Sequence, residues 1–208
     1  MTAKPAEFLR SGPESTKKAL VLAHGAGAGM RSPFMESFAA GLGARGIAVF
    51  RFEFPYMREI GETGRRRPPN PLAVLERTWR EIIAELAPLR LFIGGKSMGG
   101  RVASLVADDS DVAGLICLGY PFHPPGKPEK TRTAHLATLK TPALICQGTR
   151  DPFGTRDDVA SYTLSPTIEL LWLEDGNHSL EPRRASGLTV QDNWNRAMDR
   201  VTGFIHNL

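Results

Sequence analysis

The chain has 208 residues and a formal net charge of +4, with 41% hydrophobic and 23% charged residues. These proportions are ordinary for a globular protein and exclude an intrinsically disordered chain. No run approaches the roughly 18 consecutive apolar residues of a transmembrane helix, so we exclude an integral membrane protein and expect no membrane partner. At about 150 residues per domain, the length predicts a single domain over residues 1–208.

Two cysteines and a polar start indicate the compartment. Cys117 and Cys146 lie inside apolar runs, which predicts buried free thiols and not a disulfide framework. The first twelve residues lack the apolar core of a secretory signal, so we expect a cytoplasmic protein. The only dense basic run, Arg65–Arg67, precedes Pro68 and Pro69 and is therefore predicted to lie in a loop. Because this run is not on a recognition helix, we predict no nucleic-acid partner.

Short apolar runs rich in Val, Ile and Leu are predicted to be strands. They are continuous and not alternating, which is typical of a parallel sheet that is covered on both faces. The predicted strands are residues 19–23, 47–52, 89–93, 113–118, 143–146 and 168–173.

Helical patterns separate these strands, and Ser32–Pro33 and Asn70–Pro71 each place a proline at a predicted helix start. The predicted helices are residues 33–46, 71–86, 99–108, 134–139, a segment that begins near 155, and 189–206. This alternation predicts a doubly wound α/β fold with a mostly parallel six-stranded sheet and helices on both faces. Two long irregular stretches, residues 56–70 and 121–133, are predicted to be functional or mobile loops.

The pattern G-x-S-x-G occurs in Gly94–Gly100, with Ser97 at its centre. It follows a predicted strand and precedes a predicted helix, as a nucleophile elbow requires. Gly95 and Gly99 lie where a Cβ would clash with the strand and the helix. The turn would raise the Ser97 hydroxyl above the sheet edge and direct the N–H of Met98 toward a developing oxyanion. The alternative is a phosphate-binding turn at a helix N-terminus, although neither common nucleotide-binding spacing is present.

A serine nucleophile needs a base, and the base needs a carboxylate that orients it. With such an elbow, the partners follow in the order serine, acid, histidine, each after a later strand. Asp151 follows the fifth predicted strand, and His178 follows the sixth and is the histidine that completes this order. The competing acids Asp157 and Asp158 lie in a predicted first helical turn, where carboxylates favour the helix dipole. Asp151 itself precedes Pro152 and is alternatively a turn cap.

A glycine-rich loop follows the first predicted strand at His24–Gly29. Small residues let the backbone approach a substrate oxygen closely, so the N–H of Ala26 would join that of Met98 in an oxyanion hole. A flexible loop and a phosphate cradle are the alternatives.

Five blocks of sequence together resemble the α/β-hydrolase superfamily in its small dienelactone-hydrolase-like form and are similar to the KANL/Tex-type branch. The blocks are HGAGAG (24–29), RFEFPY (51–56), GGKSMGGR (94–101), QGTRD (147–151) and GNH (176–178). The resemblance implies Ser97 as nucleophile, His178 as general base and Asp151 as orienting acid. It also implies an oxyanion hole made of the backbone N–H groups of Ala26 and Met98.

Some features depart from the wider superfamily. Only about 18 residues precede the first predicted strand, so we expect the usual two N-terminal antiparallel strands to be missing. No long insertion supplies a helical cap, so we expect a minimal fold with an open site. Lys96 stands beside the nucleophile, where it would tune the triad, pair with Glu53 or belong to a structural ion pair below the elbow.

The sequence thus predicts a carboxylesterase-like serine hydrolase that cleaves an ester, thioester or related acyl bond of a small molecule. The alternative is a binding or scaffold protein with a silent site, which the complete set of triad residues disfavours. Family membership supports the fold better than the activity. We expect no cofactor because triad chemistry needs none, and no metal because no ligand spacing appears.

The substrate pocket is predicted from residues near the C-terminal ends of strands. Gly25, Tyr56, Phe122 and Phe153 lie there, and the aromatic residues are equally suited to the edge of the core. The Arg65–Arg67 loop would attract an anionic substrate or simply be solvated. Nothing in the sequence specifies an oligomeric state.

Overall fold

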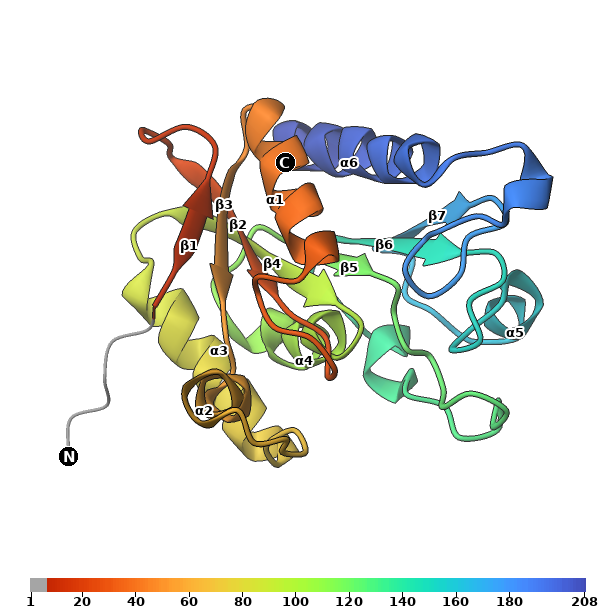
Figure 1. Ribbon diagram of the computed structural model, residues 1–208, viewed down its shortest axis with the longest axis horizontal. Coiled ribbons are helices and arrows are strands. Elements are labelled where there is room, and N and C mark those ends of the chain that lie inside the picture. The colour runs from red at the N-terminus through yellow and green to blue at the C-terminus, as the bar shows by residue number, and fades with distance from the viewer. Residues whose placement is uncertain (1–6) are drawn as a thin grey trace.

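All six predicted strands lie in one sheet of a computed structural model, which describes residues 7–208 (Figure 1). They are β2 (Lys18–Ala23), β3 (Ala48–Phe52), β4 (Arg90–Lys96), β5 (Gly114–Leu118), β6 (Ala143–Gly148) and β7 (Ile168–Leu173). Their order is β3-β2-β4-β5-β6-β7, and every neighbouring pair is parallel. The predicted α/β class with its mostly parallel sheet is confirmed.

The predicted count of six strands is wrong, because a seventh strand, β1 (Leu9–Ser11), pairs antiparallel with β3 at the sheet edge. One N-terminal antiparallel strand is therefore present, against our expectation. Three residues are too few to show a hydrophobic period. The strand is instead defined by its pairing, in which Leu9 faces Arg51 across the ladder.

Helices cover both faces of the sheet (Figure 1). On one face lie α1 (Pro33–Ala44) and α6 (Val190–Asn207), and on the other lie α3 (Leu72–Glu85) and α4 (Met98–Val106). Alternate residues of β2 divide between the two cores: Val21 packs with the α3 and α4 side and Leu22 with the α1 and α6 side. The thiols of Cys117 and Cys146 are buried and free, one in each core, as predicted.

The remaining predicted helices are short. The segment from Thr155 forms α5 (Arg156–Ala160), and Ala134–Ala137 forms only a 3₁₀ turn, η2. Residues 119–142 contain no other helix and so no helical cap between β5 and β6. Across residues 7–208, no helix is long and apolar enough to cross a membrane.

The prediction of an irregular stretch at residues 56–70 is wrong in its first half. A helix, α2 (Pro55–Thr63), begins at a proline and ends before Gly64, whose φ is +68°. Both are ordinary start and stop signals. They are easily overlooked because they enclose only nine residues, of which Tyr56 and Met57 are buried. Arg65–Arg67 follow the helix in an exposed irregular segment, as predicted.

Candidate active site

Ser97 lies at a sharp turn between β4 and α4, with φ +51° and ψ −114°. This conformation is strained for a residue with a side chain. Glycines two residues away on either side permit this turn. A Cβ on Gly95 would lie 2.2 Å from the carbonyl oxygen of Ala23, and a Cβ on Gly99 would lie 2.5 Å from the same oxygen. The N–H of Ser97 donates to the carbonyl of Leu118 at 3.1 Å, which ties the turn to β5.

Three side chains from three loops form one hydrogen-bonded chain. His178 Nε2 lies 2.8 Å from Ser97 Oγ, and His178 Nδ1 lies 2.8 Å from Asp151 Oδ2. The Asp151 carboxylate is completely buried, while the His178 side chain is 23% exposed. A carboxylate at Nδ1 favours the tautomer with its proton there and leaves Nε2 free to accept the serine proton.

The acid loop (residues 149–154) and the end of β6 together hold the Asp151 carboxylate at both oxygens. Oδ1 accepts from the Phe153 N–H at 2.9 Å, and Oδ2 accepts from Gln147 Nε2 at 2.9 Å. Gln147 is fully buried, and its Oε1 accepts from the Tyr120 N–H at 2.7 Å. The competing carboxylate of Asp158 instead accepts from the Thr155 N–H at 2.9 Å and caps α5.

The base loop (residues 174–183) carries His178 and is fastened to the acid loop by charge. Asp175 lies between Arg183, 2.5 Å away, and Arg150, 2.8 Å away. Hydrogen bonding from Arg183 is the main cause that lowers the pKa of Asp175 to about 2. Arg150 also donates its N–H to the Gly176 carbonyl at 2.9 Å. Because Arg150 immediately precedes Asp151, these contacts join the acid to the base.

The oxyanion loop (residues 24–26) is held by two buried side chains. His24 Nδ1 donates to the Gly25 carbonyl at 2.7 Å, and its Nε2 accepts from the Phe54 N–H at 3.1 Å. Burial lowers the pKa of His24 to about 4, so the ring is neutral at pH 7. The Tyr56 hydroxyl donates to the carbonyls of Gly25 and Ala26 at 3.3 and 3.0 Å. Burial raises the pKa of Tyr56 to about 12.

These contacts orient the backbone beside Ser97. In a trans peptide the C=O and N–H point in opposite directions, so holding the Gly25 carbonyl also holds the Ala26 N–H. A Cβ on Gly25 would lie 3.7 Å from the Ser97 Cβ, which shows how near this loop comes to the elbow. Met98 is the first residue of α4, where a helix offers its N–H no acceptor. Among residues 7–208, no loop carbonyl accepts from the N–H of Ala26 or Met98.

Two comparisons with known proteins bear on this geometry. A family model described as an alpha/beta hydrolase domain matches residues 16–206. The chain belongs to the α/β-hydrolase family. Among solved structures, the fold of this α/β hydrolase is similar to that of a dienelactone hydrolase from Anabaena variabilis, with a TM-score of 0.73. The two are 18% identical, and the match covers 99% of this chain and 93% of that one.

Two further solved structures share the fold. XC6422 from Xanthomonas campestris, described as an α/β serine hydrolase without a lid, is 18% identical with a TM-score of 0.65, over 99% of this chain and 88% of that one. Est1E from Butyrivibrio proteoclasticus is 13% identical with a TM-score of 0.69, over 96% and 93% of the two chains. At these identities, the likeness is one of fold.

The predicted pocket residues occupy different places in this α/β hydrolase. The Phe153 ring lies 4.3 Å from the His178 ring, centroid to centroid, and is partly exposed. Tyr56 is only 2% exposed and contacts the oxyanion loop through its hydroxyl, which donates to the Ala26 carbonyl. Phe122 is fully buried and packs against Tyr120, with 4.8 Å between the ring centroids.

Lys96 does not pair with Glu53 or with any other carboxylate among the described residues, so both predicted ion pairs are wrong. Its Nζ instead donates to the main-chain carbonyl of His178 and lies 5.4 Å from the centre of the Phe34 ring. Glu53 accepts from the Met30 N–H at 3.2 Å. Burial lowers the pKa of Lys96 to about 8. The charge sign predicted a carboxylate partner, but a carbonyl fills that place.

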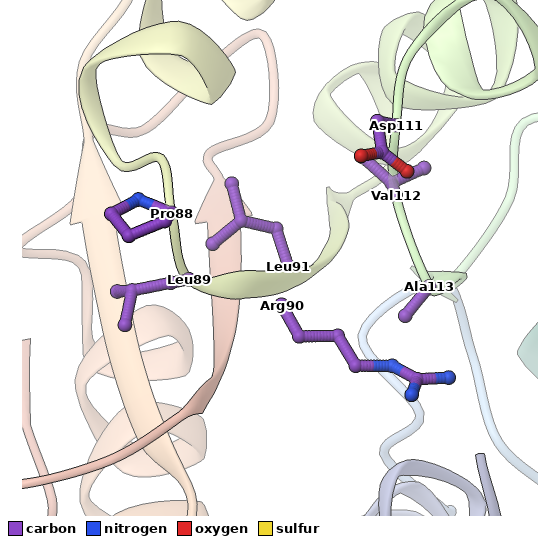
Figure 2. A pocket seen from close by; sticks show the side chains of 7 residues that line it. All are labelled: Pro88, Leu89, Arg90, Leu91, Asp111, Val112 and Ala113. Atoms are coloured by element: carbon purple, nitrogen blue, oxygen red, sulfur yellow. The ribbon is translucent and has the colours of Figure 1, made fainter.

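A hollow of about 440 Å³ lies at the opposite edge of the sheet, where β4 and β5 begin (Figure 2). Its lining residues are Pro88, Leu89, Arg90, Leu91, Asp111, Val112 and Ala113. None of these is a serine, cysteine or histidine, and Ser97 lies beyond the other end of β4. The chemistry-bearing groups are therefore at the C-terminal strand edge, where ligands of open α/β sheets bind.

Sequence reasoning missed the residues that support the site. Gln147, Arg150 and Asp175 each lie within four residues of a triad member, and that proximity in the chain was the available signal. Their partners come from other loops, so their roles appear only in the folded chain. Among the described residues, no three or more His, Cys, Asp or Glu side chains gather where they could hold a metal ion.

Proposed function

We propose that this α/β hydrolase is a serine-dependent enzyme that cleaves an ester, thioester or related acyl bond of a small molecule. The observation that carries the proposal is the chain of two 2.8 Å hydrogen bonds from Ser97 through His178 to Asp151. The dienelactone hydrolase and the serine hydrolase without a lid, which share the fold, support an acyl bond as the target. The two free buried thiols support a reducing, cytoplasmic setting.

In the acylation step, Ser97 Oγ attacks the carbonyl carbon while His178 Nε2 takes the hydroxyl proton. Asp151 stabilises the imidazolium that forms. The oxyanion of the tetrahedral intermediate accepts hydrogen bonds from the N–H groups of Ala26 and Met98, each worth about 3 kcal/mol in the transition state. The carbon–leaving-group bond then breaks, and His178 gives its proton to the departing oxygen or sulfur.

In the deacylation step, water attacks the acyl group on Ser97 and His178 takes a proton from that water. When the second tetrahedral intermediate collapses, the acid product leaves and the proton returns to Ser97 Oγ. The net reaction consumes one water and needs no cofactor. Phe153 lies over the imidazole and Gly25 lies beside the nucleophile, so these two residues border the reacting carbonyl in the proposal.

The test compares Ser97→Ala with the unaltered enzyme on 4-nitrophenyl esters that differ in acyl length and charge. We expect hydrolysis by the unaltered protein and a loss of about 10⁶-fold in kcat for the variant. Ser161→Ala serves as a matched control, because its hydroxyl only bonds the Asp158 carbonyl at the end of α5. Equal hydrolysis by Ser97→Ala would contradict the proposal, and no hydrolysis by either protein would favour a silent binding site.

A further inference from the structure

Lys96, the residue directly before Ser97, carries a buried ammonium group. The residue is 9% exposed, its Nζ donates to the His178 carbonyl, and the Phe34 ring lies 5.4 Å from Nζ. Asp151 and Glu181 attract this ammonium only from beyond ion-pair distance. A buried cation without a close carboxylate is unfavourable for folding, and an apolar side chain in its place costs less. A contribution to stability alone therefore accounts poorly for a lysine at this position.

The contact joins three segments of the chain. Lys96 ends β4, His178 belongs to the base loop, and Gly119 follows β5 between them. A Cβ on Gly119 would lie 2.6 Å from the His178 carbonyl oxygen and 3.0 Å from Lys96 Nζ. With φ +68°, this glycine provides both the conformation and the space that let the ammonium reach the carbonyl.

His178 is consequently held at two points. Asp151 holds the imidazole at Nδ1, 2.8 Å away, and Lys96 holds the main chain of the same residue. A hydrogen bond to the ring alone leaves the ring free to move with its loop. A second bond on the backbone restricts that movement and with it the distance between Nε2 and Ser97 Oγ.

We propose that Lys96 is a positioning residue, whose bond to the His178 carbonyl keeps the imidazole within hydrogen-bond reach of Ser97. This inference rests on the proposed hydrolase function. Misplacing a catalytic group by about 1 Å costs up to about 100-fold in rate. Loss of the Lys96 contact is therefore expected to lower kcat and to leave KM nearly unchanged, since the ammonium is buried against the His178 main chain and Phe34.

The variant Lys96→Met removes the donor and the charge while keeping an unbranched side chain that is one atom shorter. We expect its kcat on 4-nitrophenyl acetate to fall about 10- to 100-fold, with KM within about threefold of the unaltered value. Lys96→Arg, which keeps a charged donor, is expected to recover part of that loss. The matched control is Lys18→Met, because Lys18 Nζ donates to the Ile205 carbonyl at 3.2 Å, far from the triad. Its kcat should stay unchanged.

Several outcomes overturn the inference. An unchanged kcat in Lys96→Met contradicts it, and so does an equal fall of kcat in Lys18→Met, which would indicate a general loss of stability. If thermal melting shows that Lys96→Met does not fold, Lys96→Gln is measured instead. Its side chain is too short to reach the carbonyl, so it should show the same fall, and an unaltered kcat would again refute the role of Lys96. A parent protein that neither hydrolyses esters nor reacts with a fluorophosphonate contradicts the proposed function itself.

Discussion

The two halves of the site are held in different ways. Hydrogen bonds from the neutral side chains of His24 and Tyr56 fix the oxyanion loop. Charged groups join the acid loop to the base loop and the base loop to β4: Arg150 and Arg183 surround Asp175, and the Lys96 ammonium donates to the His178 carbonyl. The two halves should therefore respond to different perturbations. Protonation of His24 should weaken the first half, whereas salt and the removal of a charge should weaken the second.

The largest expected effect concerns the acid that orients the base. Asp151→Asn removes the carboxylate at Nδ1 and favours the wrong histidine tautomer, so we expect kcat to fall about 10⁴-fold. Steady-state ester hydrolysis measures the effect, and circular dichroism checks the fold. Asp157→Asn, on the exposed face of α5, is the matched control and should keep full activity. A fall of less than tenfold in Asp151→Asn would count against its role as the acid.

The half of the site that His24 and Tyr56 hold should become less stable in mild acid. The folded pKa of His24, about 4, lies below the ordinary histidine value of 6.5. The unfolded chain therefore binds the proton first, and the contribution to stability is complete above pH 6.5 and falls as pH drops toward 4. The expected loss is about 3 kcal/mol in the free energy of unfolding. Urea unfolding at pH 7 and pH 4 measures this loss. Between these pH values, His24→Asn should lose less free energy of unfolding than the unaltered protein, and equal losses would contradict this account.

Tyr56→Phe tests how far the oxyanion loop depends on its second support. The substitution removes the donor to the Gly25 and Ala26 carbonyls, and we expect kcat to fall about tenfold, a fraction of the cost of removing an oxyanion donor itself. The control is Tyr162→Phe, whose hydroxyl donates to the Pro128 carbonyl at 3.2 Å in an exposed loop. Equal kcat values for the two variants would show that Tyr56 does not hold the oxyanion loop.

The smallest expected effect lies in the charged half. Asp175→Asn weakens the link between the acid and base loops, and we expect kcat to fall about threefold, since partly exposed ion pairs contribute little. Salt at about 1 M should lower the kcat of the unaltered enzyme by a similar factor and should lower the kcat of the variant less. The folded pKa of Asp175 is about 2, below the ordinary aspartate value of 3.8, so its contribution to stability is present above pH 4 and is lost toward pH 2. Identical salt responses would contradict the role of this charge.

The parallel strands could be predicted from the sequence because each is a continuous apolar run. Two other elements were not predicted. β1 is three residues long and depends on pairing with β3, and α2 buries only Tyr56 and Met57. A three-residue strand shows no period, so its pairing defines it. α2 has ordinary start and stop signals, but only nine residues lie between them.

The residues of the site also divide into those that the sequence predicts and those whose partners appear only in the folded chain. Chain order selected His178, and the place directly after a predicted strand favoured Asp151; the structure brings both to Ser97. The partners of Lys96 and Arg150 could not be predicted, because they belong to loops far away in the chain. For Lys96, charge suggested Glu53, whereas the fold supplied a carbonyl of the base loop. Which carbonyl faces a lysine depends on the loop conformation, and residue type does not reveal it.

The central claim is that His178 and Asp151 activate Ser97 as a nucleophile. Incubation with a fluorophosphonate, followed by proteolysis and mass spectrometry, tests this claim most directly. We predict one adduct per chain, on the peptide that contains Ser97, and an adduct that forms much more slowly in Asp151→Asn. An unmodified Ser97 peptide under conditions that label a known serine hydrolase, or an adduct on another serine, would contradict the account.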